Sequence, residues 1–150
     1  VTASAAVLTL EEFFPGRTVA QGSFVNAWTA SRRSFDVTID GSWDGKTLTL
    51  VEDFVFADGE RDRKTWKLER QSPGVYVGRR EDVVGTARVW TEGKVVRLEY
   101  TVEMGGWTVD FSDVLYLQTP DVVMNVATVS KWRITVGRVE LSMRRVSPPS

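Results

Sequence analysis

The stretch LTLVEDFVFADGERDRKTWKLER, residues 48–70, contains two β-type segments separated by a turn signal. Side chains of a strand alternate between its two faces. One face of the first segment therefore holds Leu48, Leu50, Glu52, Phe54 and Phe56. Asp58-Gly59 favours a tight hairpin turn, and the return segment carries Arg63 and Trp66. The stretch predicts a hairpin of strands 46–57 and 63–70 whose apolar face contains one carboxylate, Glu52.

The same alternation of β-rich runs and turn signals extends along the chain. The predicted strands are 19–30, 34–43, 46–57, 63–70, 74–81, 85–91, 94–104, 107–118, 121–129 and 132–145. Short turns without helical crossovers indicate an antiparallel up-and-down meander. Closing such a sheet removes its exposed edges, so we predict an all-β barrel of about 8–10 strands, with a two-sheet sandwich as the alternative.

Only the beginning of the chain has helical character. Thr9 is a suitable N-cap, acidic residues follow it, and Pro15-Gly16 is a stop signal, which together predict a short helix over 7–14. No linker is visible, so we expect one domain over 1–150, with 146–150 as a disordered tail.

Composition excludes several kinds of chemistry. The chain has 19 basic and 20 acidic residues, a net charge of -1, and neither Cys nor His. Without a basic excess we expect no nucleic-acid partner. Without thiols or imidazoles, and with no carboxylate cluster in the sequence that would supply oxygen ligands, we expect no metal site and no cofactor. The apolar runs are too short for a membrane-spanning helix.

The first residue is Val1 rather than Met, which is compatible with a trimmed N-terminal segment. If that segment carried a signal peptide and a lipid-attachment site, we expect a periplasmic protein or an outer-membrane lipoprotein, and otherwise a cytoplasmic one. A membrane would then be reached only through the lost lipid anchor.

A second carboxylate interrupts an apolar row. Asp113 lies between Phe111 and Leu115 in the row that starts at Trp107, as Glu52 does in its own strand. An unpaired buried carboxylate costs several kcal/mol, roughly the desolvation penalty of a buried ion, so both groups need partners or a proton. They are either structural ion pairs, or ligand anchors or acid/base groups in an apolar cavity; a third possibility is a β-bulge that turns Glu52 outward.

The cations near these strands are Arg63, Arg79, Arg80, Arg88 and Lys131. Arg63 is our predicted partner of Glu52 across the turn, and Arg63 or Arg88 would suit a ligand carboxylate. The six Trp residues either fill the core or line a cavity. Our candidate set of interior, ligand-binding residues is Glu52, Phe54, Arg63, Trp66, Arg88, Tyr100, Phe111 and Asp113.

Several blocks of the sequence, taken in order, resemble the bacterial family called domain of unknown function 3833. The most specific blocks are VEDFVFADGERDRKTW and REDVVG, and DFSDVLYL, NVATVSKW and VGRVELSMRR extend the resemblance over nearly the whole chain. The resemblance implies a lipocalin-like fold, and many members are described as lipoproteins with a signal peptide and an attachment Cys. The family's polar signature falls on Glu52, Asp58, Gly59, Glu60, Arg63, Trp66, Asp82, Gly85, Asp113, Asn125 and Lys131.

The chain departs from the family pattern in three blocks, which here read GKVVRLEY, Ser112-Asp113-Val114 and KWRITVG. The favoured function is a lipocalin-like binding protein for a fatty acid, lipid or other apolar small molecule in the bacterial cell envelope. The alternatives are a barrel filled by its own side chains with a structural or envelope-assembly role, and, less favoured, a small isomerase, cyclase or hydrolase that uses Glu52 and Asp113. A cavity of at least about 300 Å³ would favour the binding protein, and a smaller one would favour the barrel filled by its own side chains.

Overall fold

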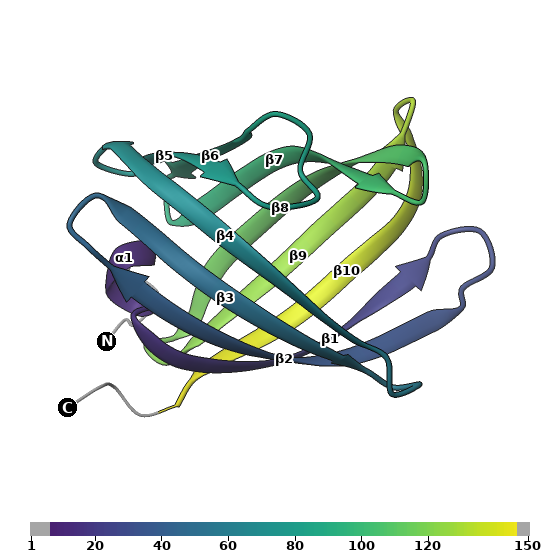
Figure 1. Cartoon of the computed structure of the whole chain (residues 1–150), viewed down its shortest axis with the longest axis horizontal. Coiled ribbons are helices and arrows are strands. Elements are labelled where there is room, and N and C mark those ends of the chain that lie inside the picture. The colour runs from purple at the N-terminus through teal and green to yellow at the C-terminus, as the bar shows by residue number, and fades with distance from the viewer. Residues whose placement is uncertain (1–6, 147–150) are drawn as a thin grey trace.

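Residues 7–146 of the chain fold into a closed antiparallel β-barrel of ten strands with one short helix (Figure 1). The computed structural model describes residues 7–146. Its elements are α1 (Leu10–Phe13), β1 (Gly16–Asn26), β2 (Arg32–Trp43), β3 (Thr47–Phe56), β4 (Arg61–Ser72), β5 (Val75–Arg79), β6 (Ala87–Glu92), β7 (Val95–Met104), β8 (Trp107–Thr119), β9 (Val122–Lys131) and β10 (Ile134–Arg145). Each strand pairs with its sequence neighbours, and β1 closes the barrel against β10. The predicted barrel is thereby confirmed, and the sandwich is excluded.

Alternation along the strands explains the closure. In β3, Leu48 and Leu50 are buried, and the intervening Thr49 lies on the other face. β7 repeats the pattern with Val96, Leu98 and Tyr100. Inward apolar rows from ten strands form one shared core, and pairing of β1 with β10 closes the ring of strands. On the β5 side, β4 is paired only over Lys67–Ser72.

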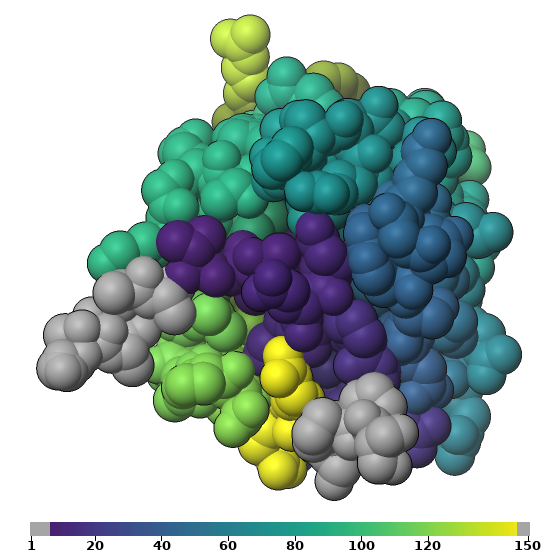
Figure 2. Space-filling model, turned by 90° about the vertical axis from the view of Figure 1, so that its left-hand side faces the viewer, coloured from purple at the N-terminus to yellow at the C-terminus, as the bar shows by residue number. Residues whose placement is uncertain are grey.

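The N-terminal segment seals one end of the barrel. The helix covers only Leu10–Phe13 of the expected range 7–14; Thr9 precedes it, but its side chain makes no capping hydrogen bond. Leu8, Leu10, Phe13 and Phe14 are all buried. Figure 2 looks onto this end and shows the purple N-terminal residues lying across it.

Contacts from three strands hold this plug in place. Arg145 of β10 donates hydrogen bonds to the carbonyl oxygens of Phe13 (3.2 Å) and Glu12 (3.1 Å). Glu11 accepts a hydrogen bond from Tyr76 and forms an ion pair with Arg70 at 3.4 Å. Because this end is closed, access to the interior lies at the opposite end, among the β1–β2, β3–β4, β7–β8 and β9–β10 turns and the β5–β6 loop (Figure 1).

Of the tail expected at 146–150, residues 147–150 lie outside the described part of the chain. Within residues 7–146, no helix has the length and apolar character needed to cross a membrane.

Candidate functional site

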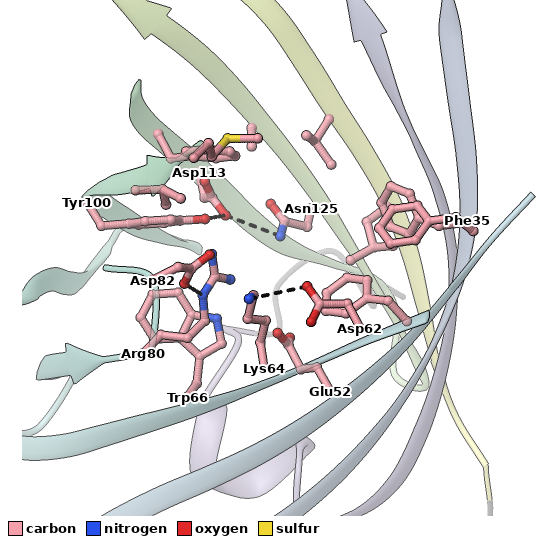
Figure 3. Close-up of a pocket in the computed structure, with 18 residues that line it drawn as sticks. Phe35, Glu52, Asp62, Lys64, Trp66, Arg80, Asp82, Tyr100, Asp113 and Asn125 are labelled. Carbon is pink, nitrogen blue, oxygen red and sulfur yellow. Dashed lines mark hydrogen bonds and ion pairs between the residues drawn. The ribbon is translucent and has the colours of Figure 1, made fainter. Parts of the chain in front are cut away.

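The barrel encloses a cavity of about 240 Å³ between its polar middle and its open end. Met104 lines the cavity and is itself 55% exposed, which marks the opening. The apolar wall consists of Phe35, Phe54, Phe56, Trp66, Tyr100, Val102, Met104, Phe111, Ala127, Val139 and Leu141. The polar lining consists of Glu52, Asp62, Lys64, Arg80, Asp82, Asp113 and Asn125 (Figure 3). The interior is therefore hollow and mostly apolar, with seven polar or charged side chains on its wall.

Glu52 occupies the inward face of β3, as the alternation predicts, and no bulge displaces it. It stands opposite Ile39 of β2 and Lys64 of β4 in the ladders. Its carboxylate lines the cavity but makes no hydrogen bond or ion pair with any residue of the described chain. The side chain is half-buried, because it faces the cavity while the barrel wall surrounds it. Burial raises the pKa of Glu52 to about 7, and the positive charge of Arg80 opposes this rise.

Asp113 lies on β8, on the opposite wall, and is held by two neutral donors. The Tyr100 hydroxyl donates to its Oδ2 at 3.1 Å, and the Asn125 side-chain amide donates to the same oxygen at 3.4 Å. Burial raises the pKa of Asp113 to about 6, and these two hydrogen bonds oppose that rise. Oδ1 of Asp113 and Oδ1 of Asn125 are buried with no partner in residues 7–146, so this wall has unused acceptors.

The interior guanidinium comes from the loop between β5 and β6. Arg80 forms a two-pronged ion pair with Asp82, with nitrogen–oxygen distances of 2.6 and 3.0 Å. Its guanidinium carbon lies 4.8 Å from the Trp66 ring centre and 5.6 Å from that of Tyr100. Arg80 is thus fixed by a carboxylate and two aromatic faces, which favours a structural role over capture of an anion.

The structure corrects two of the predicted interior residues. Arg63 lies on the outer face of β4, where it pairs with Asp53 at 2.6 Å, and it does not contact Glu52. Arg88 lies on the outer face of β6 and pairs with Glu99 at 2.6 Å. In each case the neighbouring residues on the strand point inward, so a period of two places the Arg outside.

The other six predicted residues do meet at the cavity. Glu52, Phe54, Trp66, Tyr100, Phe111 and Asp113 all line it. That they bind a ligand stays a prediction. The predicted set omitted Arg80, Asp82, Asn125, Lys64 and Asp62, all of which line the same space. Asp82 and Asn125 belonged to the polar signature of the family, which was a usable signal.

The charge balance of the cavity is acidic. Its two cations are both engaged, Arg80 by Asp82 and Lys64 by Asp62 at 3.2 Å (Figure 3). Glu52 and Asp113 remain without a cationic partner in the part of the chain that the structure describes. The cavity is thus suited to a hydrogen-bond donor or a positive charge. Within residues 7–146 no group of three or more potential metal ligands is clustered.

The fold and its hollow interior define a lipocalin-like β-barrel. Residues 1–145 match the family described as Protein of unknown function (DUF3833), and the chain belongs to that family. No curated protein matches the sequence.

Several solved structures share the fold at low sequence identity. The S-type phycobiliprotein lyase CPES from Guillardia theta has a TM-score of 0.67 at 14% identity, over 93% of this chain and 94% of that one. Rv2717c from M. tuberculosis has a TM-score of 0.60 at 15% identity, over 89% and 93% of the two chains. A de novo designed fluorescence-activating β-barrel has a TM-score of 0.53 at 14% identity, over 93% and 100%. At these identities the likeness establishes the fold.

Proposed function

We propose that the barrel binds one mostly apolar small molecule, which enters at the open end and directs a hydrogen-bond donor or a positive charge toward Glu52. The observation that carries this proposal is the apolar cavity with an unpaired carboxylate on its wall. A binding pocket is typically apolar with a few convergent polar groups, which is the arrangement seen here. The names of the phycobiliprotein lyase and the fluorescence-activating barrel support a small-molecule role by analogy of fold alone.

The charges refine the expected ligand class. A free fatty acid would need an available cation, but Arg63 and Arg88 point outward and the two inward cations are already paired. A long-chain amine or a neutral lipid with hydroxyl or amide donors is better matched to Glu52 and Asp113. The family resemblance supports a location in the bacterial cell envelope.

The cavity volume also limits the ligand. At about 240 Å³ it is below the roughly 300 Å³ that separates the two readings of the sequence, so the volume taken alone favours the filled structural barrel, which stands as the alternative. A cavity of this size accommodates one segment of a ligand, and the rest of a longer molecule would extend past Met104.

The test is displacement of a neutral fluorescent dye, Nile red, by dodecylamine and by dodecanoic acid. We expect the dye to bind, and the amine to displace it at roughly tenfold lower concentration than the acid, which is about 1.4 kcal/mol of binding free energy. The preference should shrink in Glu52→Gln. Equal displacement by amine and acid would contradict the assigned ligand class.

Cavity-filling variants test the location of binding. Ala127→Phe and Val139→Phe place a ring in the cavity and should abolish dye binding, whereas Thr128→Phe, on the exposed outer face beside Ala127, should not. A dye that binds all of these variants equally would mean that it does not occupy the barrel. Native mass spectrometry of gently purified protein would identify a bound natural ligand.

A second candidate is acid/base catalysis in the same cavity. The observation in its favour is that Glu52, with a pKa of about 7, is half-protonated near neutral pH and faces open space. If turnover of a cavity-sized substrate is found, Glu52→Gln should lower kcat by roughly 10²–10⁴-fold. Unchanged turnover would exclude Glu52 as the proton-transfer group.

A further inference from the structure

Exposed Trp side chains gather at the open end of the barrel. Trp28, Trp107 and Trp132 are 69%, 63% and 75% exposed, and they are the three exposed Trp residues of the described chain. Trp28 and Trp132 lie on the β1–β2 and β9–β10 turns, and Trp107 is the first residue of β8, directly after the β7–β8 turn. The three turns are successive around this end of the barrel. Met104 and Ile134 are also exposed there. We call these five residues the aromatic rim.

The geometry of the β9–β10 turn does not explain why a Trp is exposed there. Lys131 pairs with Ile134, which leaves a two-residue turn made of Trp132 and Arg133. Both have positive φ values, 52° and 67°, which a type I′ turn requires and which Asn and Gly adopt far more readily. Trp and Arg are therefore not the residues that the turn geometry favours, and they occupy the two positions between the paired ends of β9 and β10. The β9–β10 turn projects from the barrel in Figure 1.

Positive charge accompanies the aromatic rim. The Lys131 ammonium lies 5.8 Å from the Trp107 ring centre and 5.1 Å from that of Trp132, so it connects two of the turns. Segments 26–32 and 130–135 contain Arg32, Lys131 and Arg133 and no carboxylate.

The third turn of the aromatic rim differs, because segment 103–110 of the β7–β8 hairpin carries Glu103 and Asp110 and no cation. The positive charge of the rim therefore lies on the β1–β2 and β9–β10 turns. Further acidic residues of this end lie in the β3–β4 turn, where Arg33 pairs with Asp58 and Glu60.

We propose that the aromatic rim docks the open end of the barrel onto the surface of an anionic lipid bilayer. Trp side chains favour the bilayer interface because their rings combine an apolar body with a polar N–H, and flanking cations are attracted to anionic headgroups. Exposed Trp side chains on separate turns, with cations beside them, can insert into a lipid interface without a complementary pocket. A protein partner would instead need cavities into which these side chains pack. The docking surface is continuous with the cavity through Met104, which belongs to both.

Docking in this orientation would place the cavity opening against the lipid, so that an apolar ligand could pass between bilayer and barrel without crossing water. That role in loading rests on the proposed binding function, whereas docking itself does not.

The test is cosedimentation of the full chain with vesicles of phosphatidylcholine and phosphatidylglycerol, without added ligand. We expect binding that weakens roughly tenfold or more on vesicles of phosphatidylcholine alone. The triple variant Trp28→Ser/Trp107→Ser/Trp132→Ser should lose at least about tenfold in affinity, as should Lys131→Glu/Arg133→Glu on the anionic vesicles. The matched control Val75→Ser/Tyr116→Ser removes two exposed apolar side chains away from the aromatic rim and should bind like the wild type.

Two outcomes would overturn the proposal: no binding of the wild type to anionic vesicles, which would leave a protein partner as the occupant of the aromatic rim, or undiminished binding of the triple Trp variant. The cavity-filled variant Ala127→Phe separates the two proposals, because it should dock on vesicles normally while failing to bind Nile red. Far-UV circular dichroism of each variant verifies that the barrel is folded.

Discussion

Glu52 is a carboxylate whose position opposes its ionisation. Burial raises its pKa to about 7, so the folded state holds a proton that the unfolded chain has released near its ordinary value of 4.5. The stability associated with the protonated form is present below about pH 4.5 and is lost as the pH rises toward 7. Because ionised Glu52 destabilises the barrel, its presence is better explained by a role in the cavity than by a contribution to stability.

Replacing Glu52 by Gln should therefore stabilise the protein at alkaline pH. We expect Glu52→Gln to raise the free energy of unfolding by about 1–3 kcal/mol at roughly pH 8 and to change it little at about pH 4.5. Urea denaturation at both pH values measures the difference. Glu103→Gln, on the exposed end of β7, is the control and should stay within about 0.5 kcal/mol of the wild type. A Glu52→Gln variant that is destabilised at alkaline pH would show that Glu52 has a stabilising partner.

The Tyr100 hydroxyl supports the second carboxylate. Burial and the adjacent Asp113 raise the pKa of Tyr100 well above 10, so the hydroxyl keeps its proton and donates a hydrogen bond to Asp113. Tyr100→Phe should lower the free energy of unfolding by about 1–3 kcal/mol, because a buried acceptor loses a partner. Tyr116→Phe removes an outward-facing hydroxyl and should change stability by less than about 0.5 kcal/mol. Equal effects of the two substitutions would contradict the assigned hydrogen bond.

Among the elements, β2 and the N-terminal plug depend on one close approach. A Cβ atom at Gly41 would lie 2.1 Å from the carbonyl oxygen of Phe14. Gly41→Ala should push the plug outward and lower the free energy of unfolding by about 1–3 kcal/mol, as overpacking of a core does. Ser42→Ala, one residue further along β2 and exposed, is the control. Faster hydrogen exchange of residues 8–14 in Gly41→Ala alone would locate the effect, whereas unchanged exchange and stability would show that the plug shifts without cost.

The strands and turns were predictable because their signals are local. Asp58-Gly59 and the alternation in β3 define the hairpin that places Glu52, and neither needs information from distant parts of the chain. The wrong positions of Arg63 and Arg88 were avoidable as well. Trp66 inward requires Lys64 inward and Arg63 outward on the same strand, so the predicted set was inconsistent with the period of two.

The inward position of Arg80 could not be predicted from local signals in the sequence. It follows β5 in a loop that has no periodicity, and it enters the barrel because Asp82, Trp66 and Tyr100 hold it there. Those contacts join three separate segments, so a single sequence does not reveal them. The same holds for the size of the cavity, which depends on how side chains from opposite walls meet.

At the scale of the whole molecule, the inside and the outside of the barrel respond to pH in opposite directions. Glu52 and Asp113 have raised pKa values, about 7 and about 6, because they are buried. On the surface, hydrogen bonds donated by Arg63 lower the pKa of Asp53, and a hydrogen bond donated by the backbone N–H of Glu60 lowers that of Asp58. Interior carboxylates therefore favour folding at acidic pH, and surface carboxylates favour it at pH values above about 4.

The two groups together predict maximal stability near pH 4 to 5, roughly where the surface carboxylates are ionised and the interior ones are still protonated. Between about pH 5 and pH 8 the free energy of unfolding should fall by about 2–5 kcal/mol, a large part of the stability of a typical domain. Urea denaturation across this range measures the profile, and the double variant Glu52→Gln/Asp113→Asn is the control that should keep the profile nearly flat. A wild-type profile that is flat or rises from pH 5 to 8 would mean that a bound cation or donor already compensates the interior carboxylates, and extraction of the purified protein followed by mass spectrometry would then identify it.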